Sequence, residues 1–191
     1  HMDGYLDTVD ALSSHQTCEK KLAIMKDANC GAFAVIYGGV YLLAYAGFAY
    51  EVFAAGHILL ICPLFVLSRA LSGLCAVNLP NARKSAALRR EVPVGLETRV
   101  MAQVILRDRR RRERRAIAAM ACYCAVAVAA GMVWMSPTAG GMAAAFAVVS
   151  ALKYRRFALA QFGGVTGDTS GFFLQLCELC GLIGVWIGGL L

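Results

Sequence analysis

The stretch from Ala32 to Tyr50 reads AFAVIYGGVYLLAYAGFAY and contains no charged side chain. A helix of this length spans the hydrocarbon core of a bilayer, whereas an open strand would leave its backbone unpaired in lipid. The whole chain agrees with this interpretation, because 59% of its 191 residues are hydrophobic and only 16% are charged. A mean hydropathy of +0.61 excludes an ordinary soluble domain.

Four more apolar stretches predict membrane helices, at residues 52–77, 116–135, 138–152 (extending through 154–160) and 171–191. The connections near Glu51 and at Ser136-Pro137 are short, so we expect two antiparallel helix hairpins. The predicted fold class is all-α, a polytopic integral membrane helical bundle with about five spans. Residues 1–191 are expected to form a single membrane-embedded domain.

The basic residues are confined to one side of the predicted membrane. All 19 Lys and Arg residues fall before the first span, near the inner end of the second, in the loop at 78–115, or after the fourth. The positive-inside rule therefore places segment 1–31 and the basic loop 78–115 in the cytoplasm. The arginine-rich run at 107–115 directly precedes a span, so we expect it to contact the lipid bilayer and no nucleic acid.

Three aspartates near the start of the chain, Asp3, Asp7 and Asp10, share one face of a predicted helix. Such stacked charges repel unless a cation lies among them, and Mg²⁺ is bound through a few carboxylates together with substrate phosphates. Asp168 lies in a glycine-rich segment, 163–171, on the same side. We therefore predict a Mg²⁺ site formed by these four carboxylates. The spacing alone leaves open a solvated helix face and a merely connecting turn.

Two further segments bring polar groups to that side. Lys26, in the stretch 25–31, could pair with phosphate or with the carboxylates. Arg69 follows Ser68 near the inner end of the second span, and Glu178 lies about two turns into the last one. Three roles for Arg69 stay open: phosphate binding, pairing with Glu178, and snorkelling to the membrane interface.

The segments 1–10, 25–31, 68–69 and 163–168 resemble, in the same order, the signature blocks of the cobalamin synthase family, the adenosylcobinamide-GDP ribazoletransferases. The resemblance implies a Mg²⁺-dependent transferase, with segment 1–31 as its cytoplasmic metal-binding part. The catalytic and metal-binding residues that it implies are Asp3, Asp7, Asp10 and Asp168. The substrate-binding residues that it implies are His1, Lys26, Asp27, Asn29, Ser68, Arg69, Gly164, Thr166 and Gly167.

The resemblance also implies the reaction and its place. The enzyme would join α-ribazole, or its 5′-phosphate, to adenosylcobinamide-GDP through the ribazole 3′-hydroxyl and release GMP. It would be a multi-pass protein of the bacterial inner membrane, with an active-site cavity that opens to the cytoplasm between the glycine-rich segment and the aspartate helix. An oligomer is compatible with the sequence.

Some features depart from the family pattern. The family normally has membrane helices before the first block, so we expect this chain to represent the family without that N-terminal segment. His1-Met2 fits the block and equally fits a cloning remnant, and Gln175 stands where some members have glutamate. A CDP-alcohol phosphotransferase is disfavoured because no Ala-Arg follows the Asp3-Gly4 pair. A small-molecule transporter is disfavoured because most acids lie near the membrane surface.

Overall fold

The computed structural model describes residues 1–27, 29–83, 115–117, 119–120, 123–124, 126, 130–131 and 136–191. Its elements are α1 (Met2–Ser13), α2 (Cys18–Ile24), α3 (Ala32–Ala54), the short 3-10 helix η1 (Ile58–Leu60), α4 (Ile61–Asn78), α7 (Pro137–Phe162) and α8 (Gly167–Gly189). The described residues contain no named strand, and their β-type pairing is an isolated bridge between Asn81 and Val165. The all-α class is therefore confirmed for this part of the chain.

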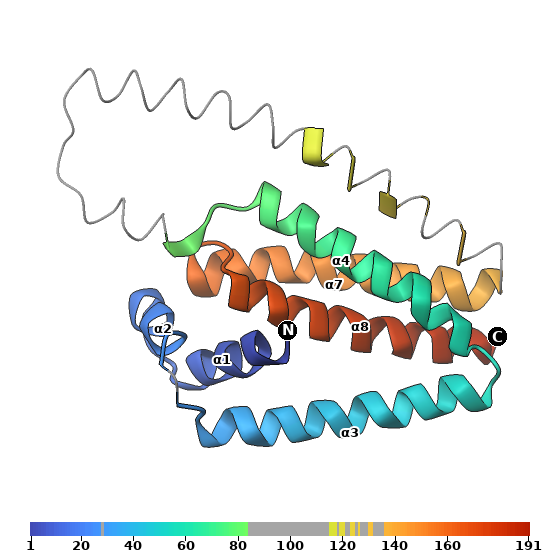
Figure 1. The fold of residues 1–191 in the computed structure, drawn as a ribbon, viewed down its shortest axis with the longest axis horizontal. Helices are drawn as coiled ribbons and strands as arrows, with labels where there is room; N and C mark the ends of the chain where they lie inside the picture. The colour runs from blue at the N-terminus through green and yellow to red at the C-terminus, as the bar shows by residue number, and fades with distance from the viewer. Residues whose placement is uncertain are drawn as a thin grey trace.

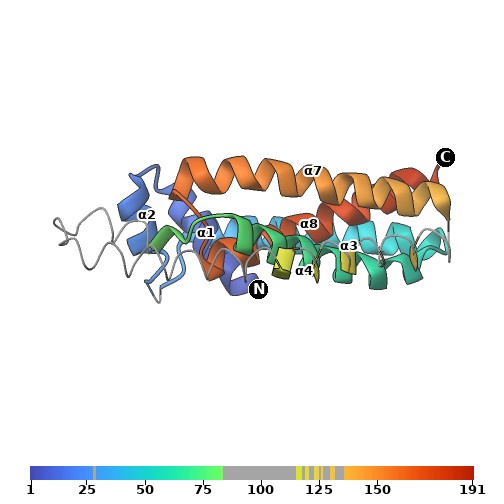
Figure 2. The same cartoon turned by 90° about the horizontal axis from the view of Figure 1, so that it is seen from above.

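The four long helices α3, α4, α7 and α8 run side by side, and the short helices α1 and α2 lie together at one end of the bundle (Figure 1). That end also holds the start of α3 and α8 and the finish of α4 and α7. The short helix α1 lies between α3 and α8 and packs against both. The turned view shows α7 along one side of the bundle, where it packs most extensively on α8 (Figure 2).

Three of the described helices are long and apolar enough to cross a membrane: Ala32–Ala54, Ile58–Asn78 and Gly167–Gly189. They correspond to the first, second and fifth predicted spans. The third predicted span, 116–135, falls largely outside the described residues, as does the basic loop from 84 to 114. The helix at the fourth span, α7, is long enough but rich in alanine and glycine and basic near its end, and it does not qualify.

The predicted boundary near Glu51 was wrong. Helix α3 continues through Glu51 to Ala54, and the chain turns at Gly56, whose φ of +77° lies in the left-handed region that favours glycine. Glu51 is exposed on the helix surface, so its charge does not need to end the helix. A single charge beside an apolar run therefore marked the membrane edge in the sequence but not the end of the helix.

Close helix packing in the bundle depends on small residues. A Cβ atom at Gly184 would lie 2.8 Å from the Ala143 Cα, and one at Gly188 would lie 2.6 Å from the Ala139 Cα. Glycine thus lets the α8 backbone touch the α7 backbone, a device common between membrane helices. By contrast, α3 exposes large apolar side chains such as Leu43, which is 78% exposed, and this outward face suits contact with lipid.

Candidate functional site

The crossing of α1 and α8 positions the predicted acids. A Cβ atom at Gly4 would lie 2.7 Å from the carbonyl oxygen of Asp168 and 2.8 Å from its Cα. A Cβ atom at Gly171 would lie 2.9 Å from the carbonyl oxygen of His1. The two helices therefore meet backbone to backbone. This contact brings the first turns of α1 against Asp168, which lies 165 residues further along the chain than Asp3.

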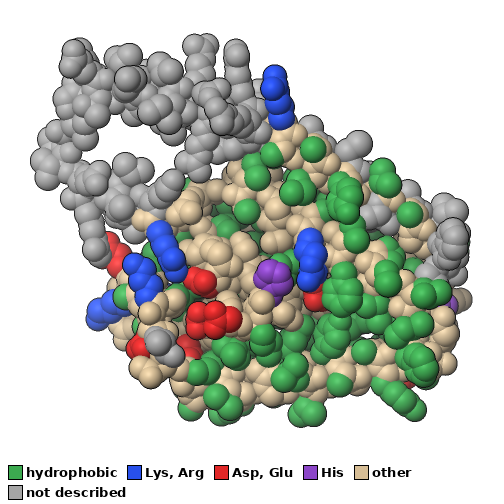
Figure 3. Space-filling view, viewed as in Figure 1, with side chains coloured by type: hydrophobic (Ala, Val, Ile, Leu, Met, Phe, Trp, Pro, Cys, Tyr) green, Lys and Arg blue, Asp and Glu red, His purple; other side chains and the backbone are tan. Residues whose placement is uncertain are grey.

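The carboxylates of α1 and α8 act on one another electrostatically. The pKa of Asp7 is raised by partial burial first, and then by the negative charges of Asp3, Asp168 and Asp10. We call Asp3, Asp7 and Asp168 the acid cluster. The space-filling view shows acidic and basic side chains gathered over this end of the molecule, while hydrophobic side chains dominate the other end (Figure 3). A cation in the acid cluster would relieve the repulsion at Asp7.

An arginine already contacts this cluster. The guanidinium of Arg83 donates a hydrogen bond of 2.8 Å to the carboxylate of Asp168. The pair is only partly exposed: 47% of the Arg83 side chain and 27% of the Asp168 side chain reach the surface. Nothing in the sequence distinguishes Arg83 from the other basic residues of its loop.

The glycine-rich segment holds Arg83 in place. The Val165 N–H donates to the Pro80 carbonyl at 2.8 Å, and the Ala82 N–H donates to the Val165 carbonyl at 3.1 Å. A Cβ atom at Gly164 would collide with the same Pro80 carbonyl oxygen. Gly164, predicted to bind substrate, thus docks the segment that carries Arg83, and we call these contacts the 80–82 clamp.

The neighbouring residues start helix α8. Thr166 is its N-cap, and the Thr166 hydroxyl accepts a hydrogen bond of 3.1 Å from the Thr169 N–H in a reciprocal capping box. The Tyr154 hydroxyl donates to the Thr169 hydroxyl at 3.2 Å and ties the cap to α7. Thr166 is therefore buried, and its hydroxyl caps the helix. Gly167, by contrast, is exposed beside Asp168, and no atom lies within 4 Å of where its Cβ atom would be.

The Asp10 carboxylate binds the start of helix α3. Its two carboxylate oxygens accept hydrogen bonds from the backbone N–H groups of Gly31 and Ala34, the latter at 3.0 Å. These are the N-cap and third residue of α3, where a helix leaves N–H groups without internal partners. Asp10 thus caps α3 from α1, a contact that the sequence did not predict. Its role as a metal ligand stays a prediction.

The predicted substrate residues of segment 25–31 lie in an exposed turn. The Asp27 carboxylate accepts a hydrogen bond of 3.0 Å from the Asn29 N–H and another of 2.9 Å from its side-chain amide. Lys26 is exposed beside them. The Asp27 and Asn29 contacts are local to the turn, and among the described residues no hydrogen bond or ion pair joins Lys26, Asp27 or Asn29 to the acid cluster.

Ser68 and Arg69 belong to a separate polar cluster between α4 and α8. The Arg69 guanidinium forms an ion pair with Glu178, and the Ser68 hydroxyl lies 3.1 Å from the same carboxylate. Glu178 is buried, only 6% exposed, and it lies ten residues beyond Asp168, or about 15 Å along the helix. Of the three roles left open for Arg69, the structure therefore shows the pairing with Glu178.

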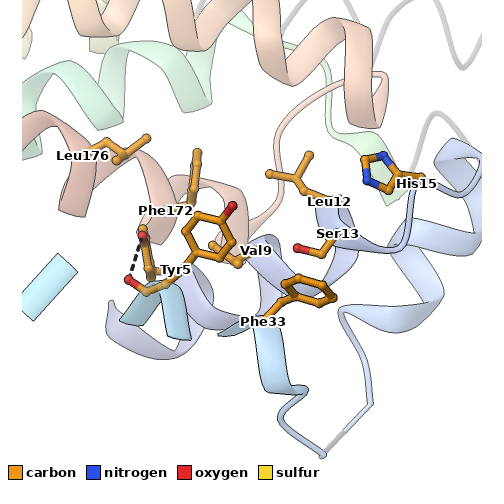
Figure 4. Close-up of a pocket in the computed structure, with 9 residues that line it drawn as sticks. Tyr5, Val9, Leu12, Ser13, His15, Phe33, Phe172 and Leu176 are labelled. Carbon is orange, nitrogen blue, oxygen red and sulfur yellow. Dashed lines mark hydrogen bonds between the residues drawn. The ribbon is translucent and has the colours of Figure 1, made fainter. Parts of the chain in front are cut away.

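Two described cavities lie away from the acid cluster. One, of about 430 Å³, opens between α1, α3 and α8 and is lined by Tyr5, Val9, Leu12, Ser13, His15, Phe33, Tyr37, Phe172 and Leu176 (Figure 4). Its α1 residues lie on the helix face opposite the aspartates. The other, of about 420 Å³, is a largely apolar space between α7 and α8. The predicted substrate cavity beside the glycine-rich segment stays a prediction.

Comparison with known proteins identifies the family. The model of the cobalamin-5-phosphate synthase family matches residues 1–186. The chain belongs to this family. It is 37% identical over 179 residues to an adenosylcobinamide-GDP ribazoletransferase of Lachnoclostridium phytofermentans, covering 94% of this chain and 62% of the relative. It is also 31% identical over 177 residues to one of Geobacillus kaustophilus, covering 92% and 62%. No solved structure gives a significant match.

The donor set of this cobalamin-5-phosphate synthase family chain fits Mg²⁺ in one specific way. No group of three His, Cys, Asp or Glu side chains within the described ranges lies close enough to hold a metal ion by itself. Mg²⁺ usually binds through one or two carboxylates plus substrate phosphates and keeps several waters. An all-oxygen pair such as Asp7 and Asp168, with the repulsion that raises the pKa of Asp7, is compatible with that mode.

Proposed function

We propose that this family member is an adenosylcobinamide-GDP ribazoletransferase that joins α-ribazole, or its 5′-phosphate, to adenosylcobinamide-GDP and releases GMP. The relatives that carry this name support the proposal. The chain spans about 62% of the length of the Lachnoclostridium relative. The observation that carries it is the α1–α8 crossing, which places family-pattern acids from opposite ends of the chain together.

The reaction demands charge neutralisation and alignment. The ribazole 3′-hydroxyl attacks the phosphorus next to the cobinamide arm, and GMP leaves as the bond between the two phosphates breaks. Displacements at phosphorus are accelerated mainly by positioning and by electrostatic stabilisation of the phosphoryl oxygens. When bound, Mg²⁺ would supply Lewis-acid polarisation of those oxygens, held by Asp7 and Asp168 with Asp3 beside them.

The chain's own residues contribute rigidity and charge. The glycines at the crossing fix Asp168 against α1, and the capping box at Thr166 fixes the start of α8. Asp10 anchors the other end of α1 to α3. Each contact involves backbone atoms, which move less than long side chains. The acids are therefore presented to substrate on a fixed frame rather than on a flexible loop.

We further propose that the site faces the cytoplasm of a bacterium, from its inner membrane. The three candidate spans and the one-sided distribution of Lys and Arg support this orientation. In a cysteine-free background, a cysteine placed at the exposed Ala55 should react with a membrane-impermeant reagent in intact cells, and one placed at Lys26 should not. The reverse labelling pattern would contradict the orientation.

The decisive experiment measures GMP release by the purified membrane protein. Adenosylcobinamide-GDP, α-ribazole and Mg²⁺ are supplied together, and each is omitted in turn. We expect GMP only in the complete mixture, and we expect Asp168→Asn to lower its rate by about a hundredfold or more, because the metal site loses a charged ligand. Glu51→Gln, an exposed carboxylate on α3 near the opposite end of the bundle, is the control. No GMP from the complete mixture would overturn the proposal.

A further inference from the structure

Arg83 is a basic side chain that the structure places directly on the acid cluster. It donates to Asp168 at 2.8 Å, yet 47% of its side chain remains exposed. Exposed ion pairs of this kind contribute little to stability, because solvent screens them. A guanidinium also offers five N–H donors in a plane, more than one carboxylate contact uses. Its position therefore suits a second anion that arrives beside Asp168.

The backbone around Arg83 is built to keep it there. Two hydrogen bonds of the 80–82 clamp join its segment to Val165, three residues before Asp168. The same clamp requires glycine at 164, since a Cβ atom there would collide with the Pro80 carbonyl oxygen. Ala82, next to Arg83, is 1% exposed and packs in a cluster with Ala11 of α1 and Phe162 of α7. Arg83 thus follows a segment that is held against α1, α7 and Val165.

The two basic residues that the sequence suggested for the phosphates, Lys26 and Arg69, are not paired with Asp168 within the described part of the chain. The Arg69 guanidinium is engaged by Glu178, about 15 Å along α8 from Asp168. Lys26 lies on an exposed turn, and the ion pairs of the described residues do not include one between Lys26 and the acid cluster. A diphosphate held partly by a metal ion still carries negative charge on its remaining oxygens, and arginine matches their geometry with paired hydrogen bonds.

We propose that Arg83 is a substrate-binding residue that holds the diphosphate of the nucleotide-linked substrate beside Asp168, and that the 80–82 clamp positions it. The proposal rests on the proposed function, because it assigns the substrate class of the same site. In the substrate-free protein the guanidinium neutralises Asp168. When substrate binds, it turns to the phosphate oxygens and leaves the carboxylate to the metal. The α-ribazole substrate lacks a diphosphate and makes no contact with Arg83.

The first experiment measures binding without turnover. Mg²⁺ and GDP serve as the probe, and isothermal titration gives the dissociation constant for the wild type, Arg83→Gln, Arg83→Lys and the control Arg156→Gln, an exposed arginine on α7. We expect Arg83→Gln to weaken GDP binding about tenfold or more and Arg83→Lys to weaken it less, since one charge-assisted contact is lost or loosened. Wild-type affinity in Arg83→Gln would overturn the proposal. If Arg83→Gln fails to fold, Arg83→Met takes its place, and wild-type GDP affinity in that variant would overturn the proposal.

The second experiment separates the two substrates and the two proposals. With GMP release as the readout, Arg83→Gln should raise the KM for adenosylcobinamide-GDP about tenfold and leave the KM for α-ribazole unchanged. Gly164→Ala should reproduce this pattern by displacing the clamp, while Gly47→Ala, which has no atom within 4 Å of its Cβ position, should not. Equal rises in both KM values, or none, would overturn the assignment. Failure of the wild type to release GMP would refute the proposed function, and the GDP titration would still test Arg83.

Discussion

Helix α8 crosses two neighbours through glycines, and the two crossings serve different ends. In its second half, Gly184 and Gly188 admit the backbone of α7 at Ala143 and Ala139, within a cluster of apolar side chains. In its first turns, Gly171 meets α1 where Gly4 meets Asp168, and carboxylates line the contact. Close backbone contact at glycine therefore stabilises the α7–α8 packing in the second half of α8, and it positions carboxylates at the α1–α8 crossing in the first half. A change at each crossing should separate these consequences.

The largest effect is expected at the charged crossing. Gly4→Ala would place a methyl group 2.7 Å from the Asp168 carbonyl oxygen, and backbone on both sides cannot yield as a flexible side chain would. Because α1 must then move away from α8, we expect the rate of GMP release per folded molecule to fall about a hundredfold. Gly47→Ala on α3 is the matched control. Near-normal turnover in Gly4→Ala would show that the α1–α8 distance does not matter to the site.

Between the two crossings, the Arg69–Glu178 pair joins α4 to α8. Arg69→Ala would leave the buried Glu178 carboxylate with the Ser68 contact but without its cation. We expect the free energy of unfolding in detergent to fall by about 2 kcal/mol, and Glu178→Gln in the same protein to restore part of it. Arg156→Ala is the control. A lower kcat/KM at unchanged stability would instead support phosphate binding by Arg69.

The apolar crossing should affect stability alone. Gly184→Ala would bring a methyl group within 2.8 Å of the α7 backbone, far from the acid cluster. Overpacking of this kind costs about 2 kcal/mol. Thermal unfolding in detergent should show the loss, while GMP release per folded molecule stays at the wild-type rate. Gly39→Ala, at a position with no atom within 4 Å, is the control and should be neutral or slightly stabilising. If Gly184→Ala lost GMP release but kept the wild-type stability, the crossing of α7 and α8 would not serve stability alone.

The sequence predicted what depends on composition and spacing, and it failed where distant segments meet. Apolar run length was enough to locate three helices that are long and apolar enough to cross a membrane, because a bilayer requires a minimum length of every crossing helix. The family pattern selected Asp3, Asp7, Asp10 and Asp168, and the structure brings Asp3, Asp7 and Asp168 to one helix crossing. The structure adds roles that no local pattern encodes. Asp10 caps a helix 21 residues away, and Gly164 docks a segment that follows α4.

Arg83 illustrates the same limit most clearly. It is one of 19 basic residues, and nothing in its immediate sequence distinguishes it. Its partner Asp168 is 85 residues away, and the contact depends on a backbone bridge between Asn81 and Val165. Likewise, the end of α3 depended on which residue could turn the chain, and Gly56 rather than Glu51 has that property. Long-range pairing and turn geometry, not composition, decided these features.

The smallest expected effect tests the electrostatics of the charged crossing. Asp7→Asn removes the carboxylate whose pKa is raised by burial and by Asp3, Asp168 and Asp10. A raised pKa means that folded protein holds this proton more tightly than unfolded protein does, so the ionised form destabilises the fold. The penalty begins as pH rises through the ordinary value of 3.8 and is complete above the raised pKa. At pH 7 with a chelator, we therefore expect Asp7→Asn to be more stable than the wild type by a few tenths of a kcal/mol.

The difference should shrink as the pH falls through the raised pKa and close below the ordinary value of 3.8, where both states of the wild type bind the proton. Addition of Mg²⁺ should reverse the order, because the ion stabilises the wild-type cluster and binds the variant weakly. Thermal unfolding at about pH 3 and at pH 7, with chelator or with Mg²⁺, measures all four conditions, and Glu51→Gln is the control for a generic loss of charge. A wild type that is more stable than Asp7→Asn at pH 7 in chelator would show that another group already neutralises Asp7. The obvious candidate is Arg83, which contacts Asp168. Arg83→Gln should then cost less stability in the Asp7→Asn background than in the wild type. An equal or larger cost in the Asp7→Asn background would rule Arg83 out as the group that acts on Asp7.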